Sequence, residues 1–214
     1  MYYHKPVTVI ITIDGIAASG KSSVASRVAR ALNIPYISSG YLYRAVTHLV
    51  YVLQIDPSNQ KAILEALETH PLTLIPHPEE NEVWQGEHNY TSALHTSEVD
   101  RMVSEIAQHP QVRDWVNVQL KKLPAPFVAE GRDMGTAVFP QAKHKFYLTA
   151  RSKVRAQRRA KERPEDIASI QAALELRDQE DQVQSKPAED ALLIDTSDLT
   201  LEQVVERILK GVHT

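Results

Sequence analysis

The stretch Gly15-Ile-Ala-Ala-Ser-Gly-Lys-Ser-Ser23 decides the fold that we predict for this chain. It meets the pattern G-x-x-x-x-G-K-[ST], directly follows the apolar run Val7–Ile13 and leads into an amphipathic segment. A strand, a glycine-bounded loop and a helix are the context in which backbone amides and a helix N-terminus bind phosphate groups. In such a loop Lys21 reaches the outer phosphates and the hydroxyl of Ser22 binds Mg²⁺. The stretch therefore predicts a phosphate-binding loop.

The composition is that of an ordinary globular chain. Its 214 residues suit one large domain, or one domain with inserts. A net charge of −3 argues against general attraction to nucleic acid. Cysteine is absent, which excludes disulfides and thiolate metal sites. No apolar run reaches the ~20 residues that span a bilayer, and the N-terminal MYYHKP lacks the apolar region of a signal peptide. We expect a cytoplasmic protein with no membrane or nucleic-acid partner.

Strand and helix patterns alternate along most of the chain. Val24, Val28 and Leu32 lie four residues apart and predict a helix that ends near Asn33 and Pro35. Further strands are predicted at Tyr36–Ile37, Phe127–Ala129, Lys145–Leu148 and Ala191–Ile194, and further helices at 41–53, Thr96–His109, Val112–Leu123, 151–163, 166–184 and Thr200–Lys210. This alternation predicts an α/β fold with a central parallel sheet.

Residues 56–95 have a different character. A short helix, Gln60–Glu68, precedes three short strands at Leu72–Ile75, Val83–Gln85 and His88–Thr91, of which the last two join around Gly86-Glu87. The segment is too short to bury a core alone. We therefore predict a single domain, 1–214, with a core of about 1–55 and 96–214 and an insert of about 56–95.

The segment Arg151–Arg163 is strongly basic, with seven Lys or Arg among its thirteen residues. Arg155, Arg158 and Arg159 share one face of the predicted helix. Taken alone, the segment fits a solvated surface helix, and a nucleic-acid patch is disfavoured because interleaved aromatic residues are missing. Together with a phosphate-binding loop, it predicts a mobile cationic lid at about 151–165.

Three more short motifs stand out. Ser39-Gly-Tyr-Leu-Tyr-Arg44 and Glu130-Gly-Arg-Asp-Met-Gly-Thr136 each follow a predicted strand, on the edge where α/β proteins bind ligands. Each contains an arginine, whose planar fork matches phosphate oxygens, although either motif alone could be a surface turn. In the third, Arg177 and Asp181 share a helical face, which also fits a plain ion pair. The histidines are scattered and predict no metal site.

These motifs together resemble the bacterial-type cytidylate kinases, members of the nucleoside monophosphate kinase family of P-loop proteins. TIDG-x(4)-GKSS, SSGYLYR, HPQVR, EGRDMGTAVFP and RDQED occur in the family's order over nearly the whole chain, and EGRDMGTAVFP is the most specific. The resemblance implies a P-loop three-layer α/β fold with a central parallel sheet, a small strand-rich NMP-binding insert and a helical lid. It also implies in-line transfer of the γ-phosphoryl group of ATP, with Mg²⁺, to CMP or dCMP.

The resemblance also implies roles for individual residues. ATP would be bound by the loop residues Gly15, Ile16, Ala17, Ala18, Ser19, Gly20, Lys21, Ser22 and Ser23. CMP would meet Ser39, Arg44 and Arg132 at its phosphate, Ser104, Arg113 and Asp133 at its base, and Arg177 and Asp181 at the sugar and the transferring phosphate. The catalytic cations would be Lys21, Arg132, Arg177 and the lid residues Arg155 and Arg159, and Ser22 would bind the Mg²⁺.

The chain departs from the family at two places. Ala18 stands where many relatives have a third glycine, and no arginine follows Asp181 in the stretch Gln182–Lys186. Within the kinases the alternatives are UMP or shikimate as acceptor. From other classes, a nucleotide-dependent switch or a nucleic-acid-binding protein remains open, although the guanine-reading N-K-x-D motif is absent. We expect a monomer.

Overall fold

The structure, a computed structural model, describes residues 9–161, 166–180 and 185–212. Its internal contacts divide the chain into two compact units, Met1–Ile34 with Ala125–Thr214, and Pro35–Pro124. The first unit is therefore assembled from two distant parts of the chain, whereas the second is continuous.

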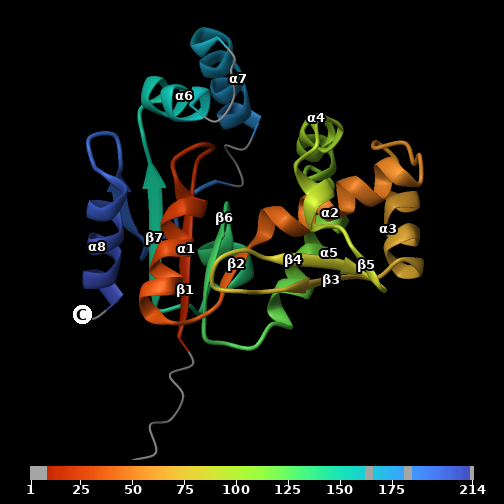
Figure 1. The fold of residues 1–214 in the computed structure, drawn as a ribbon, viewed down its shortest axis with the longest axis horizontal. Coiled ribbons are helices and arrows are strands. Elements are labelled where there is room, and N and C mark those ends of the chain that lie inside the picture. The colour runs from red at the N-terminus through yellow and green to blue at the C-terminus, as the bar shows by residue number, and fades with distance from the viewer. Residues whose placement is uncertain (1–8, 162–165, 181–184, 213–214) are drawn as a thin grey trace, which may run out of the picture. The chain divides into compact units, whose positions relative to one another are not determined.

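A parallel sheet forms the centre of the first unit (Figure 1). Its strands are β1 (Ile10–Gly15), β6 (Phe127–Gly131), β7 (His144–Thr149) and β8 (Leu192–Asp195). With β2 (Tyr36–Ser38) the strand order is β2-β6-β1-β7-β8, and β1 pairs in parallel with β6 and β7. Ile11, Thr12 and Ile13 are fully buried, as expected of a strand covered on both faces. The predicted α/β fold with a central parallel sheet is confirmed.

Helices complete the first unit. They are α1 (Lys21–Leu32), α6 (Ser152–Ala160), α7 (Ile167–Glu180) and α8 (Leu201–Val212), together with η2 (Met134–Val138), a single π-helical turn. Helices α1 and α8 pack against each other, and α6 pairs with α7 (Figure 1). Helix α1 ends where the sequence predicts, because Asn33 adopts a left-handed conformation and its amide donates to carbonyls of the last turn.

The second unit combines helices with a small antiparallel sheet. Its elements after β2 are α2 (Ser39–Val52), α3 (Gln60–Thr69), β3 (Leu72–Ile75), β4 (Glu82–Gln85), β5 (His88–Asn89), η1 (Thr91–His95), α4 (Ser97–Ile106) and α5 (Pro110–Lys121). The three strands have the order β3-β4-β5, and β4 and β5 form the predicted hairpin around Gly86. The predicted small antiparallel sheet is confirmed.

Asn81 holds β2, at the start of the second unit, through two hydrogen bonds. Its side chain accepts from the amide of Ser38 and donates to the carbonyl of Tyr36, both at 2.7 Å, and it has no exposed surface. Because a buried amide side chain must satisfy its polar groups, these bonds tie β2 to the loop between β3 and β4. Helices α2 and α4 pack together above a core that includes Leu42, Leu49 and Leu94.

Some element boundaries differ from the prediction. The strand predicted at His88–Thr91 ends at Asn89, because Thr91 already begins η1. Pro110, predicted to separate two helices, is the first residue of α5, where its missing N–H costs nothing. Parts of three predicted elements, in 7–8, 162–163 and 181–184, lie outside the described residues. Among the helices that the structure describes, none is long and apolar enough to cross a bilayer.

Candidate functional site

The loop Gly15–Ser23 connects β1 to α1 and depends on a glycine at its first position. Gly15 has φ +150°, and a Cβ atom placed there would lie 2.1 Å from the carbonyl oxygen of Leu148 in β7. Only glycine therefore permits the close approach of the two strands. Ala18 adopts φ 56° and packs against a cluster that contains Ile170 and Leu174 of α7.

Lys21 is the first residue of α1, and its side chain turns back over the loop. Its Nζ donates to the carbonyl oxygen of Ile16 at 2.8 Å. The ammonium group thus lies beside the loop amides and the N-terminus of α1, where the helix dipole is positive. This arrangement concentrates positive charge where an anion would bind.

Ser22 and Glu130 form the second feature of the loop. The Ser22 hydroxyl donates to Oε1 of Glu130 at 3.1 Å, and Glu130 is buried at the end of β6, level with Ile13 of β1. Hydroxyl and carboxylate oxygens are the ligands that Mg²⁺ prefers, and Mg²⁺ usually takes only one or two protein carboxylates besides substrate phosphates. The described residues contain no larger cluster of metal-binding side chains. The Ser22–Glu130 pair fits this cation.

Arg155 connects the lid helices to the loop. It is only 4% exposed, and its three guanidinium nitrogens donate to the carbonyl oxygens of Ala150 and Ala17 at 3.0 and 3.1 Å and to Oδ2 of Asp178 at 2.6 Å. The ion pair with Asp178 joins α6 to α7. Arg155, predicted to lie in a mobile lid, is thus buried against the backbone of the phosphate-binding loop.

Arg158 makes a similar link one turn further on. Its guanidinium donates to Oγ1 and the carbonyl oxygen of Thr196 at 2.9 and 2.6 Å, directly after β8. The Thr196 hydroxyl in turn donates toward the carbonyl oxygen of Ser19 at 3.3 Å. Arg159 follows on α6 and is partly buried. Arg177 lies on α7, but its side chain, like all of Asp181, is outside the described part of the chain.

The segment after β6 carries Arg132 and Asp133. Arg132 is half-buried, and its guanidinium lies 3.4 Å from the hydroxyl of Ser185. Asp133 is 7% exposed, and its carbonyl oxygen accepts from the amides of η2. Both amides that follow, those of Met134 and Gly135, donate to the carboxylate of Asp14 at the end of β1.

Asp14 is the titratable group whose environment is most unusual. Burial raises its pKa from 3.8 to about 6, against the opposing effect of the two amide bonds. The neighbouring Asp133 raises the pKa further, whereas Lys21 lowers it. Burial also raises the pKa of the Tyr147 phenol, and the charge of Asp14 raises it further. The pKa of Asp14 therefore lies near the physiological range.

In the second unit, Arg44 is held in a fixed position on α2. One guanidinium nitrogen donates to the carbonyl oxygen of Leu94 and another to Oδ1 of Asp100, both at 2.8 Å. The Arg44 and Asp100 side chains are 19% and 18% exposed. Because two nitrogens of the planar guanidinium are hydrogen-bonded in this way, the orientation of the whole group is fixed.

Arg113 lies close to the same helix. Its guanidinium carbon is 5.5 Å from the ring centre of Tyr43, and one nitrogen donates to the carbonyl oxygen of Ala107 at 3.1 Å. Ser39, the first residue of α2, is 5% exposed, and Ser104 on α4 is partly buried. The second unit thus carries, on α2, α4 and α5, four of the residues predicted for the acceptor site.

Comparison with known proteins identifies the family. The family model for cytidylate kinase matches residues 11–214. The chain belongs to the cytidylate kinase family. A cytidylate kinase from Deinococcus deserti is 59% identical over 199 residues, which cover 93% of this chain and 96% of that protein. A cytidylate kinase from Thermus thermophilus is 54% identical over 204 residues, covering 95% and 98%.

A solved structure outside the cytidylate kinase family shares the fold. The shikimate kinase from Bacteroides thetaiotaomicron superimposes with a TM-score of 0.51 over 96% of this chain and 99% of that chain, at 12% identity. A likeness at such low identity concerns the fold alone. It agrees with the three-layer P-loop architecture that the sequence predicts.

The predicted residues fall into two groups in this member of the cytidylate kinase family. The first unit contains the loop Gly15–Ser23, Arg132, Asp133, Arg155 and Arg159, and the second contains Ser39, Arg44, Ser104 and Arg113. Within the first unit, hydrogen bonds join Arg155 to the loop and Ser22 to β6. The individual ligand roles of these residues remain predictions.

Four charged residues that hydrogen-bond to the predicted site residues or to the segments that carry them were not predicted as site residues from the sequence. They are Asp14, Asp100, Glu130 and Asp178. Asp14 and Glu130 follow apolar strands on the edge that carries the predicted site, and this position was an available signal. Asp100 and Asp178 gave no comparable signal, because each acts through an arginine that is distant in sequence.

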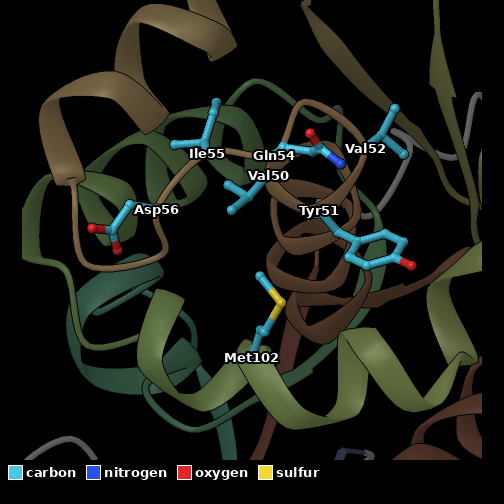
Figure 2. A pocket seen from close by; sticks show the side chains of 7 residues that line it. All are labelled: Val50, Tyr51, Val52, Gln54, Ile55, Asp56 and Met102. Atoms are coloured by element: carbon cyan, nitrogen blue, oxygen red, sulfur yellow. The ribbon is translucent and has the colours of Figure 1, made fainter.

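A separate hollow of about 550 Å³ opens at the end of α2. Tyr51, Gln54 and Met102 are among its lining residues, and Figure 2 shows Met102 reaching toward it from α4. None of the predicted site residues lines it. This hollow is therefore distinct from the residues that carry the family motifs.

Proposed function

We propose that this chain transfers the γ-phosphoryl group of ATP to CMP or dCMP, giving ADP and CDP or dCDP by direct in-line transfer. The observation that carries the proposal is the loop Gly15–Ser23 of a cytidylate kinase family member, with Lys21 over its amides and Ser22 beside Glu130. The cytidylate kinases of Deinococcus deserti and Thermus thermophilus match this chain along nearly their whole length, which supports the same activity here.

The reaction needs charge neutralisation more than a proton acceptor. The attacking CMP phosphate already carries a charge of roughly −1.5 to −2 at neutral pH, so no general base is required. Each pair of unit charges ~4 Å apart repels by about 4 kcal/mol at an effective dielectric constant near 20. Lys21, Arg132 and Arg159 would offset this repulsion and stabilise the loose transition state.

The ATP side is the loop and its surroundings. The amides of Gly15–Ser23 would bind the phosphates, while Arg155 and Arg158 hold the loop carbonyls of Ala17 and Ser19. Ser22 and Glu130 would hold Mg²⁺, which would supply positive charge to neutralise the phosphates. Because Arg155 and Arg158 donate to protein acceptors, they are poorly placed to form a nucleic-acid patch.

The acceptor side would read both the phosphate and the base of CMP. Ser39 and Arg44 would bind the phosphate together with Arg132, and Arg177 and Asp181 would approach the sugar. Cytosine offers an amino donor at N4 and acceptors at N3 and O2. Asp133 would accept from N4, while Ser104 and Arg113 would donate to N3 and O2. Uracil exchanges donor for acceptor at positions 3 and 4, which would leave the protein groups at these positions unpaired. We therefore expect CMP to be preferred to UMP.

Three further points belong to the proposal. Residues 56–95 would act as the NMP-binding insert and about 151–165 as the lid, which would close when both substrates are present and exclude water. The protein would work as a cytoplasmic monomer. Lys186, exposed just beyond the position where relatives have an arginine, would supply a point charge instead of a fork.

The decisive experiment measures ADP release with a panel of CMP, dCMP, UMP, AMP and shikimate. Turnover with CMP and dCMP above the other acceptors is expected, and no turnover with either cytidine nucleotide would refute the proposal. Asp133→Asn tests the base reading separately. Its CMP/UMP ratio of kcat/KM should fall by about tenfold, since one hydrogen bond to a charged group is lost. An unchanged ratio would remove Asp133 from the base site.

A further inference from the structure

Asp14 has no role in the proposed chemistry, yet both its carboxylate oxygens are used. Oδ1 accepts from the amide of Met134 at 2.8 Å, and Oδ2 accepts from the amide of Gly135 at 2.7 Å. The residue is 5% exposed. Both oxygens are thus turned toward the backbone after β6, and the side chain is shielded from solvent.

The contact is tight on the side of the loop as well. A Cβ atom on Gly135 would lie 2.9 Å from Oγ1 of Thr12, 3.2 Å from Oδ2 of Asp14 and 3.3 Å from Cδ of Lys145. Glycine is therefore the residue that allows the backbone to approach the carboxylate.

The π-helical turn η2 extends the same attachment to Asp133. The amides of Ala137 and Val138 donate to the Asp133 carbonyl oxygen at 2.8 and 3.2 Å, and the amide of Phe139 donates to that of Met134 at 2.7 Å. Single π turns of this kind are frequent at functional sites. With Asp14 at one end and η2 at the other, the backbone of 133–135 has little freedom to move.

We propose that Asp14 is a positioning residue for the acceptor nucleotide: its carboxylate fixes the segment that presents Arg132 and Asp133. Because Asp14 also directly precedes Gly15, it joins the acceptor-reading segment to the phosphate-binding loop through one side chain. The inference rests on the proposed function, in which Arg132 and Asp133 meet CMP. It concerns a residue to which the proposed function assigns no substrate contact.

Charge supports this role. Keeping a carboxylate ionised in a buried place is costly, and burial raises the pKa of Asp14 to about 6. The titratable groups that interact with it electrostatically are Lys21 on α1, Asp133 after β6 and Tyr147 on β7. A site that only needed to fill space would be served by an uncharged residue, whereas only a carboxylate offers acceptors to both amides.

The test compares Asp14→Asn with Thr12→Val. The first keeps the shape but turns one acceptor into a donor that faces an amide. The second is a control on the same strand, because the Thr12 hydroxyl is buried and has no hydrogen-bond partner among the described residues. Four quantities are measured in wild type and in both variants. They are KM for CMP, the CMP/UMP ratio of kcat/KM, the dissociation constant of ATP, and amide hydrogen exchange at 134 and 135.

Asp14→Asn should raise KM for CMP by about tenfold, the equivalent of one charge-assisted hydrogen bond, and should lower the CMP/UMP ratio. The ATP dissociation constant should stay within about twofold, and exchange at Met134 and Gly135 should accelerate together. Thr12→Val should leave all four readouts unchanged. An unchanged KM for CMP, or an equal loss of ATP and CMP affinity, would overturn the inference.

Two outcomes separate this inference from the proposed function. Wild-type protein that does not use CMP refutes the function, and the inference falls with it. Wild-type protein that uses CMP, combined with rapid exchange of the Met134 and Gly135 amides, overturns the inference alone. This second measurement needs no variant, so it decides the matter even where Asp14→Asn fails to fold.

Discussion

Replacing Asp14 by Asn should change how the stability of this protein depends on pH. Burial raises the pKa of Asp14 from 3.8 to about 6 in the folded state. For a group whose pKa is raised by folding, the stabilising contribution is present below the unfolded value of 3.8 and is lost as pH rises through about 6. Wild-type protein therefore loses stability through this carboxyl as it ionises, and Asn has no such loss.

The size of the effect follows from the size of the shift. A rise of roughly two units corresponds to about 3 kcal/mol when Asp14 is fully ionised. Because the unfolded chain already ionises near pH 4, about 1.6 kcal/mol is lost at pH 5 and about 1.4 kcal/mol more between pH 5 and pH 8. The free energy of unfolding of Asp14→Asn, relative to wild type, should thus increase by about 1.4 kcal/mol over that range.

Urea unfolding at pH 5, 6, 7 and 8 measures this difference directly. The hydrogen bond lost in Asp14→Asn adds an offset that does not vary with pH, so only the slope matters. Thr12→Val, on the same buried strand, should differ from wild type by a constant amount. Parallel curves for Asp14→Asn and wild type, or a difference that shrinks toward pH 8, would refute a raised pKa at this site.

Three further predictions concern the loop and the lid. Gly15→Ala should lower the free energy of unfolding by about 4 kcal/mol or more, because its Cβ would lie 2.1 Å from a carbonyl oxygen of β7. The control is Gly86→Ala, at φ +58° with no atom within 4 Å of the added Cβ. In the same thermal or urea unfolding this change should lower the free energy of unfolding by only about 1 kcal/mol. Asp178→Asn leaves the buried guanidinium of Arg155 without its ion-pair partner and should lower the free energy of unfolding by about 3 kcal/mol. Amide exchange in α6 and α7 should become faster, and unchanged exchange would contradict the role of this ion pair in joining the two helices. Glu130→Gln should raise the Mg²⁺ concentration for half-maximal ADP release by about tenfold at fixed ATP, and an unshifted Mg²⁺ titration would exclude Glu130 from the cation site.

Local signals in the sequence were sufficient for the elements of the fold. The pattern from Gly15 to Ser22 requires a strand before it and a helix after it, and both are present as β1 and α1. Helix α1 ends at Asn33 because asparagine tolerates the left-handed conformation and Pro35 follows. The hairpin around Gly86 is equally local. Such features depend on residues only a few positions apart, so one sequence is enough to predict them.

Features that depend on distant partners could not be predicted in the same way. The basic residues of 151–163 indicated a mobile cationic lid but gave no sign that Arg155 is buried, where Asp178 and the carbonyl of Ala17 accept from it. The turn η2 is stabilised at its start by Asp14, about 120 residues earlier in the chain. Helical periodicity contains no information about either contact. These partners become visible only when the strands are placed side by side.

The buried charges of the first unit follow one pattern. Asp14, Glu130 and Arg155 are each at most 6% exposed, and each is bonded to the phosphate-binding loop or to the segment after β6. Burying a charge lowers stability unless it is paired, so such groups are poor choices for holding a fold together. They do restrict the backbone to one arrangement, and a transition state with dispersed negative charge is stabilised most by donors that need not reorganise. The stability lost at Asp14 is therefore best understood as the cost of holding in register the two segments that we propose bind the substrates.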